Sequence, residues 1–231
     1  MALLEYYPPT RPYLHLLYRD DDILVLDKAS GLLSVPGKAP EHKDSLQLRV
    51  QRVFPSASVV HRLDMATSGI MLFALNKDAH RHLSRQFEHR EVDKTYIARV
   101  WGKLEQKSGS IDAPLICDWP NRPKQMIDYE RGKSALTHFE LLKNDAYSSL
   151  VKLKPHTGRS HQLRVHMLSI GHVILGDKLY AHEEAKNAAK RLLLHAQFIR
   201  FSHPRHNKPV SYESLHPFAI EPQLGKSDSA K

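Results

Sequence analysis

A carboxylate close to an arginine is the first feature of the sequence that could do chemistry. The string HRLDMATSG at residues 61–69 places Asp64 two residues after Arg62. A carboxylate held near a guanidinium is stabilised in its charged form, and an ionised carboxylate in a polar cleft can be a nucleophile. The alternative is that Asp64 only caps a turn through Thr67 and Ser68. Turn statistics favour that alternative for an isolated aspartate.

A second string, TGRSHQLRVH at residues 157–166, leads through Gly-Arg-Ser into a predicted helix that opens at Ser160. The first backbone N–H groups of a helix have no partner within it, so they form a natural anion site. Arg164 lies one turn into this helix. We consider it a candidate partner for a distant carboxylate, and the alternative is a surface ion pair.

A third string, KTYIARV at residues 94–100, reads as a strand. Alternate side chains of a strand share a face, which groups Tyr96 with Ala98 and Val100. Tyr96 could present its ring to a nucleic-acid base. A tyrosine in such a position is more often a core residue whose hydroxyl has a partner.

The sequence is basic, with 34 Lys and Arg against 25 Asp and Glu, a formal net charge of +9. Residues 146–176 hold no acid but carry four Lys or Arg and four His, which suggests a face for an anion. Residues 119–125 place Arg122 and Lys124 near Trp119, a combination that suits a phosphate backbone and a stacked base. A solvated surface and a stiff loop over the core are the alternatives.

Several classes of protein and site are excluded by missing patterns. The longest apolar run has six residues, residues 70–75, so no membrane span is expected, and the N-terminus lacks a signal-peptide pattern. Cys117 is the single cysteine. Sixteen histidines are present, but no His-Glu-x-x-His string and no nucleotide-binding or serine-hydrolase motif occurs. We therefore expect no metal, no cofactor and a cytoplasmic location.

The elements that must position these residues are mostly strands. Strands are predicted at residues 14–18, 23–27, 69–75, 95–101, 136–142, 150–154 and 193–201. Helices are predicted at residues 45–54, at 77–90 and from Ser160. Because helices and strands do not alternate strictly, we expect an α+β fold with a mixed, mainly antiparallel sheet and peripheral helices. The expected organisation is an extended arm (1–13), one domain (14–218) and a polar tail (219–231).

These strings occur in the order typical of one enzyme family. They lie at residues 27–32 (DKASGL), 61–69, 94–98 and 158–166. Together they resemble the RluA family of pseudouridine synthases over about residues 18–201. Ala29 stands where that family usually has proline, which costs some turn rigidity. The strings at 31–37 and 117–125 resemble a branch of the family that acts on both 23S rRNA and tRNA.

The resemblance implies an eight-stranded sheet crossed by a central RNA-binding cleft, without the S4 domain that many relatives carry. It also implies a reaction. The C1′–N1 bond of a uridine breaks, the base turns, and C5 bonds to C1′, with no cofactor required.

The resemblance further implies roles for individual residues. Asp64 matches the catalytic aspartate, Tyr96 the tyrosine that stacks on the target base, and Arg164 the basic partner of the aspartate. Leu163 would help to form the apolar pocket wall, and Arg62 would enter the space that the base leaves. Whether Asp64 attacks C1′, adds to the base or abstracts a sugar proton stays open. The remaining predicted substrate-binding residues are His61, Thr67, Arg122, Lys124, Arg159 and His161.

The predicted partners are stem-loops of 23S rRNA and the anticodon stem-loop of tRNA, with no membrane partner and a monomeric state. Three alternatives stay open. The first is a synthase that acts on only one of the two RNAs, and the second is an RNA-binding protein without turnover. The third is a glycosidase-like hydrolase, but that chemistry usually needs two opposed carboxylates, and the motifs offer one.

Overall fold

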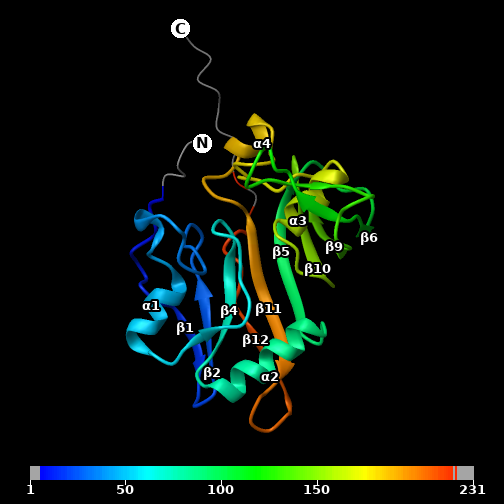
Figure 1. The fold of residues 1–231 in the computed structure, drawn as a ribbon. Coiled ribbons are helices and arrows are strands. Elements are labelled where there is room, and N and C mark those ends of the chain that lie inside the picture. Colours follow the sequence, from blue (N-terminus) through cyan, green and yellow to red (C-terminus); the bar gives the residue numbers. More distant parts are fainter. Residues whose placement is uncertain (1–5, 221, 223–231) are drawn as a thin grey trace. The chain divides into compact units, whose positions relative to one another are not determined.

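A computed structural model describes residues 6–220 and 222 of the chain (Figure 1). These residues form two compact units. The first unit comprises residues 6–95 and 195–215, and the second comprises residues 96–194, 216–220 and 222. The expected single domain over 14–218 stays a prediction, and each unit is described separately.

The first unit is built on a mixed group of strands. Its main strands follow the order β1 (Leu16–Arg19), β2 (Ile23–Lys28), β4 (Ser68–Ala74) and β11 (Leu194–Ser202). Two shorter strands add side pairs, β3 (Ser58–Val59) on β4 and β12 (Pro209–Glu213) on β11. The β4–β11 pair is parallel and lies side by side in Figure 1, and the other pairs are antiparallel. Every residue of β4 is buried, which explains its apolar run at residues 70–74.

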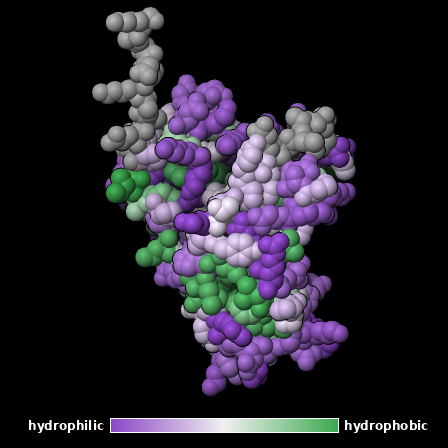
Figure 2. Space-filling model, turned by 90° about the vertical axis from the view of Figure 1, so that its left-hand side faces the viewer, coloured by the Kyte–Doolittle hydropathy of each residue, from purple (hydrophilic) through white to green (hydrophobic). Residues whose placement is uncertain are grey.

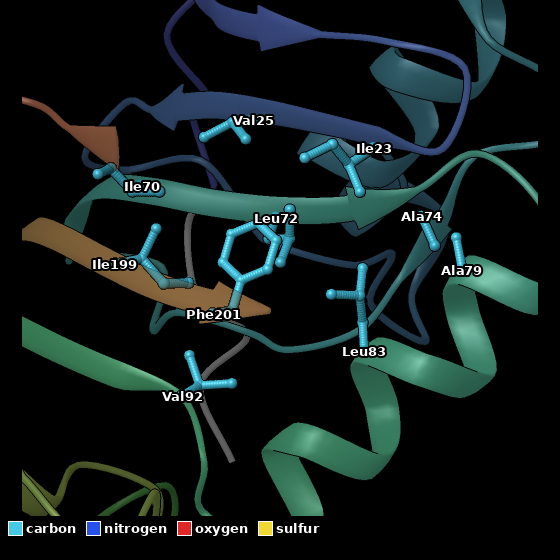
Figure 3. Close-up of a cluster of buried hydrophobic side chains, with 10 residues drawn as sticks. All are labelled: Ile23, Val25, Ile70, Leu72, Ala74, Ala79, Leu83, Val92, Ile199 and Phe201. Carbon is cyan, nitrogen blue, oxygen red and sulfur yellow. The ribbon is translucent and has the colours of Figure 1, made fainter. Parts of the chain in front are cut away.

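Helix α2 (Lys77–Glu88) covers part of this sheet. Figure 3 shows Leu83 of the helix pointing towards Leu72 and Phe201 of the strands, and Ala79 pointing towards Ala74. The side chain of Asn76 caps the helix by accepting a hydrogen bond from the Ala79 N–H. Helix α1 (Leu46–Val53) and the 3-10 helix η1 (Pro40–His42) complete the first unit.

The second unit is built on antiparallel strands. Their order is β5 (Asp93–Trp101), β10 (Ser148–Pro155), β9 (Leu136–Asn144) and β6 (Ser108–Asp112). A separate two-stranded sheet pairs β7 (Leu115–Cys117) with β8 (Gln125–Ile127). Strand β5 begins in the first unit and continues into the second after Thr95.

Helix α3 (Gln162–Ser169) carries the most buried polar residues of the second unit, and α4 (Glu183–Asn187) is a short helix. The Gln162 amide donates to the Leu136 carbonyl and to Thr137 Oγ1, both at 3.0 Å. His166 pairs through Nδ1 with Thr137 Oγ1 and through Nε2 with the Ala113 carbonyl, each at 2.9 Å. Burial lowers the pKa of His166. These bonds attach α3 to β9 and hold the helix in a defined orientation.

The predicted fold class is confirmed, since the sheet is large and mostly antiparallel and the helices are few. The sheet has ten strands. Eight of them form one continuous order, four described with each unit, and β3 and β12 pair at the side with β4 and β11. Strands β3, β6, β7, β8 and β12 were not predicted. Strands β3, β7 and β8 have only two or three residues, and β6 and β12 have the mixed sequences SGSID and PVSYE. Helix α3 begins at Gln162 rather than at Ser160, because His161 adopts a left-handed backbone with φ 55°.

The predicted arm contains no helix or strand among residues 6–13, and Tyr6 attaches it to the first unit. The Tyr6 hydroxyl donates to the Asp44 carbonyl at 2.8 Å and accepts from the Leu33 N–H at 3.0 Å. Residues 1–5 of the arm, and residues 221 and 223–231 of the predicted tail, lie outside the described residues.

The face of the molecule in Figure 2 is mainly hydrophilic, with one larger hydrophobic patch below its middle and smaller hydrophobic groups elsewhere. Within residues 6–220 and 222, none of the helices has the length and apolar sequence needed to cross a membrane.

Candidate active site

Asp64 lies on a tight turn in the first unit, between β3 and β4. The Thr67 N–H donates to the Asp64 carbonyl at 3.1 Å, which closes the turn. Asp64 is half-buried, Arg62 is exposed and Thr67 is buried. The turn that the sequence suggested is therefore present, and it is closed by the backbone.

Lys28, at the end of β2, is fully buried beside this turn. Its Nζ donates to the carbonyls of Ala29, Leu32 and Met65, at 2.9, 2.7 and 3.1 Å. A buried ammonium is costly unless its donors are satisfied, and here three carbonyl oxygens accept from it. One of them belongs to the residue directly after Asp64, so Lys28 holds the backbone of the turn.

Other residues of the segment after β2 also bind the backbone of this turn. Ser30 Oγ donates to the Ala66 carbonyl at 2.6 Å, and the Gly31 N–H donates to the Met65 carbonyl at 2.8 Å. Ser34 Oγ donates to the Leu63 carbonyl at 2.6 Å and accepts from the Leu63 N–H at 3.1 Å. The backbone is thus held on both sides of Asp64, which gives the segment at 27–32 a structural role in the site.

His61 makes its described contacts within the first unit. Its ring stacks on Phe87 with the ring centroids 4.7 Å apart, and its Nε2 accepts a hydrogen bond from the Leu72 N–H at 3.0 Å. Burial, and to a smaller extent the charge of Lys94, lowers the pKa of His61 to about 3. The ring is therefore neutral at pH 7 and packs the start of the motif onto β4. Its predicted contact with substrate stays a prediction.

We expect His61 to make the protein less stable as the pH falls. Below pH 6.5 the unfolded state takes up a proton that the native ring does not bind until about pH 3. In His61→Gln, an amide oxygen replaces Nε2 as the acceptor and does not titrate. Urea unfolding at pH 7, 5.5 and 4 should show a smaller loss of stability for the variant than for the wild type. Equal losses would contradict this assignment.

In the second unit, Arg164 is held by a buried carboxylate. Its Nε and NH2 groups donate to Asp177 Oδ2 and Oδ1 at 2.7 and 2.6 Å. The Arg164 side chain is 5% exposed and that of Asp177 is not exposed. The surface ion-pair interpretation of Arg164 is therefore wrong, because the pair is buried and bidentate. The pairing with Asp64 that the resemblance implies stays a prediction.

Tyr180 connects several of the predicted site residues. The Arg164 guanidinium lies over its ring, 5.0 Å from the centroid. Its hydroxyl lies 2.7 Å from His161 Nδ1 and accepts from the Gln125 N–H at 2.8 Å. The structure therefore brings together Arg164, His161 and the end of the loop that carries Lys124.

Trp119 and Arg122 stack on each other in this loop, with the guanidinium 4.5 Å from the ring centroid. Trp119 is 65% exposed, and Arg122 is also exposed. An exposed ring with an arginine on one face offers a surface for a base and a phosphate. Lys124 is half-buried, and the exposed Arg159 donates to the Ser134 carbonyl at 3.1 Å.

Tyr96 and Leu163 occupy different elements of the second unit. Tyr96 is a half-buried residue of β5 and lies opposite Leu153 of β10. Leu163 is buried in the first turn of α3, directly before Arg164.

One group among the described residues has the donor atoms for a metal ion, namely Asp20, Asp22 and His203. These side chains are already paired, two with each other and one with an arginine outside the group. His203 Nε2 lies 2.8 Å from Asp20 Oδ2, and Arg205 Nε donates to Asp22 Oδ2 at 2.6 Å. Because a guanidinium already neutralises Asp22, the geometry is that of an ion-pair network.

Known proteins with similar sequences decide the family. The RNA pseudouridylate synthase family profile matches residues 22–169. A Yersinia pestis protein described as "Dual-specificity RNA pseudouridine synthase RluA" is 60% identical over 86% of this chain and 97% of its own length. The Escherichia coli K12 protein with the same description is 54% identical over 93% of this chain and 98% of its own. The chain belongs to the RNA pseudouridylate synthase family.

Solved structures agree with this assignment. Human RNA Pseudouridylate Synthase Domain Containing 1 is 31% identical, with a TM-score of 0.75 over 89% of this chain and 84% of its own. Human RNA Pseudouridylate Synthase Domain Containing 4, at 23% identity and a TM-score of 0.70, shares the fold.

Sequence reasoning missed three residues that organise the site of this synthase, namely Lys28, Asp177 and Tyr180. One signal for Asp177 was present, because it is the first acid after the acid-free residues 146–176, which contain Arg164. Lys28 lies in the string at 27–32, but no pattern in that string indicated its burial, because a lysine is almost never fully buried. Nothing in the sequence marks the contacts of Tyr180.

Proposed function

We propose that this pseudouridine synthase modifies uridines in stem-loops of both 23S rRNA and tRNA. The support comes from relatives of nearly equal length whose description is "Dual-specificity RNA pseudouridine synthase RluA", at up to 60% identity. The observation that carries the chemistry is the turn at Asp64, whose backbone is held on both sides by residues 28–34. A fixed carboxylate loses little entropy when it reacts.

Asp64 attacks the uridine and forms a bond that breaks again before the product leaves, and the positive charge of Arg164 stabilises the carboxylate. The C1′–N1 bond of the uridine breaks, N1 is protonated, the C1′–C5 bond forms, and the C5 proton leaves. Product and substrate are isomers, so no oxidant and no second substrate enter. Tyr96 stacks on the base and assists removal of the C5 proton, while Leu163 supplies an apolar wall.

RNA binding uses basic residues of both units. Taking a base out of its stack costs a few kcal/mol, and insertion of the exposed Arg62 into the vacated space offsets part of that cost. Arg122, Lys124, Arg159 and His161 contact the stem-loop near Trp119. Affinity should fall with rising salt, as neutralised phosphates release counterions. In this proposal the synthase is a cytoplasmic monomer that needs neither metal nor cofactor.

The deciding experiment is release of tritium from RNA labelled at uridine C5, because the C5 hydrogen must leave when the C5–C1′ bond forms. Total tRNA and a 23S rRNA transcript are assayed in parallel in buffer containing EDTA, after refolding of each RNA. Release from both RNAs supports dual specificity. Release from one RNA alone replaces this proposal with a single-substrate synthase.

Tyr96→Phe should slow the reaction while leaving RNA binding close to that of the wild type. The ring still stacks, but the hydroxyl that assists proton removal is lost. General acid–base assistance is worth about 10²-fold or more. Single-turnover tritium release at saturating enzyme measures the chemical step, and filter binding measures affinity. An unchanged rate would restrict Tyr96 to stacking.

A further inference from the structure

The contacts of Asp177 are those of a residue built to hold one arginine in one orientation. Oδ1 accepts from Arg164 NH2 at 2.6 Å, from the Leu179 N–H at 2.9 Å and from the Tyr180 N–H at 3.2 Å. Oδ2 accepts from Arg164 Nε at 2.7 Å. The carboxylate is therefore held by the backbone of its own turn, and it in turn holds one edge of the guanidinium through two N–H groups. Bidentate pairs of this kind define direction as well as distance.

Tyr180, at the end of the same turn, restricts Arg164 from a second side. Its ring lies against the guanidinium, 5.0 Å away, which favours one plane for that group. Its hydroxyl contacts His161 Nδ1 at 2.7 Å, and His161 is the residue with positive φ that precedes α3. A non-glycine residue keeps such a backbone only where its surroundings impose it. The turn at 177–180 therefore restrains the Arg164 guanidinium from two sides, and it also contacts the residue before α3.

The turn also reaches the loop that carries Trp119, Arg122 and Lys124. The Tyr180 hydroxyl accepts from the Gln125 N–H at 2.8 Å, at the point where the loop ends and β8 begins. One hydroxyl thus joins α3 to the predicted RNA-binding loop.

We propose that Asp177 and Tyr180 are positioning residues of this synthase, Asp177 for the catalytic Arg164 and Tyr180 for the RNA-binding loop. The inference rests on the proposed function, because it needs Arg164 to act in catalysis. Neither residue touches the reacting atoms in this scheme. Asp177 acts on the chemical step through Arg164, and Tyr180 acts on RNA affinity through Gln125.

The first test compares the rates of two variants. Asp177→Asn keeps one acceptor oxygen but turns an NH2 group towards Arg164, so the guanidinium must move. A displacement of about 1 Å can cost about 10²-fold in rate, so kcat should fall by about that factor with little change in KM. Tyr180→Phe keeps the ring and loses the hydroxyl, so KM for RNA should rise with kcat nearly unchanged. The opposite pattern, or equal effects of both variants on both constants, would overturn the proposal.

A matched control separates positioning from folding. Asp145 also pairs with a buried arginine of the second unit, through a bond of 2.6 Å to Arg99 NH1. Asp145→Asn should lower the melting temperature while kcat of the folded enzyme stays near that of the wild type. Assays run below the melting transition of each variant. If Asp145→Asn and Asp177→Asn lose kcat alike, general destabilisation explains the loss and the inference fails.

The decisive step combines changes at both ends of the ion pair. Arg164→Lys keeps the positive charge but loses the planar guanidinium, so it already removes the bidentate pair with Asp177. We expect Asp177→Asn to cost much less in the Arg164→Lys background than in the wild type. If the double variant loses kcat by the product of the two single losses, Asp177 acts independently of Arg164 and the inference is overturned.

Variants of Arg164 and Asp177 also distinguish failure of the inference from failure of the proposed function. Full activity of Arg164→Lys and of Arg164→Met would remove the catalytic role of Arg164 itself. Loss of activity in Arg164→Met together with a fully active Asp177→Asn would refute the inference alone. Recovery of kcat in Asp177→Glu, which restores a bidentate carboxylate, would support the positioning role.

Discussion

Asp64→Asn should abolish pseudouridine formation and leave RNA binding nearly unchanged. Asparagine has almost the same shape, and the turn that carries it is closed by backbone atoms and held by residues 28–34. The variant therefore loses the negative charge and the nucleophilic oxygen without losing its place. Removing an essential nucleophile costs on the order of 10⁴-fold or more. Tritium release measures the rate, and filter binding of the same stem-loop measures affinity.

The matched control is Asp78→Asn. Asp78 belongs to the same unit, its side chain is 91% exposed, and the partner described for it is Arg81 at 3.5 Å. This change alters the net charge by the same amount, so it corrects for any general effect of charge on RNA binding. Residual catalysis well above background in Asp64→Asn would remove the nucleophile assignment. A large loss of binding in Asp64→Asn alone would show that the carboxylate acts in recognition.

The sequence predicted best the elements whose own residues show a clear apolar run or a helical pattern. Strand β4 is buried on both faces, so its apolar run at 70–75 marked it within a residue or two. The capped, amphipathic α2 was predicted at 77–90 and spans Lys77–Glu88. Strand β6, with the sequence SGSID, forms because β9 offers it an edge. Pairing with β9, rather than the composition of β6, makes this segment a strand, so its local sequence could not predict it.

The candidate site divides in a similar way. Asp64, Tyr96 and Arg164 were found because their strings are family motifs. Asp177 was missed because its bond to Arg164 spans 13 residues and depends on how the turn at 177–180 packs. Lys28 was missed for a different reason. A lysine is expected in solvent, and only the folded chain shows the three carbonyls that accept from its ammonium group.

Gly69→Ala should be the most destabilising single-methyl change in the first unit. Gly69 has φ +114°, and a Cβ there would lie 2.3 Å from the oxygen and 2.5 Å from the nitrogen of Ala196. These are backbone atoms of the parallel partner strand β11, so they cannot rotate away. Backbone strain and overpacking together predict a loss of about 3–5 kcal/mol. The midpoint of urea unfolding, at an unchanged slope, measures it.

Two other glycines separate the cost of backbone strain from the cost of overpacking. Gly171 has φ +83°, and no atom lies within 4 Å of the place that a Cβ would take, so Gly171→Ala should cost about 1–2 kcal/mol from backbone conformation alone. Gly158 has open space and no positive φ, so Gly158→Ala should fall within about 0.5 kcal/mol of the wild type. If Gly69→Ala costs no more than Gly171→Ala, the close approach of β4 and β11 is not a constraint on the fold.

The same substitution tests how the turn at Asp64 is held. Gly69 lies five residues after Asp64, and its tight contact with Ala196 fixes the start of β4. If β4 positions the turn, the folded fraction of Gly69→Ala at low temperature will lose kcat as well as stability. If that fraction keeps its kcat, the bonds from Lys28, Ser30 and Ser34 hold Asp64 without help from β4. Lys28→Met should then lower kcat in the folded enzyme, because it removes the bond to the Met65 carbonyl.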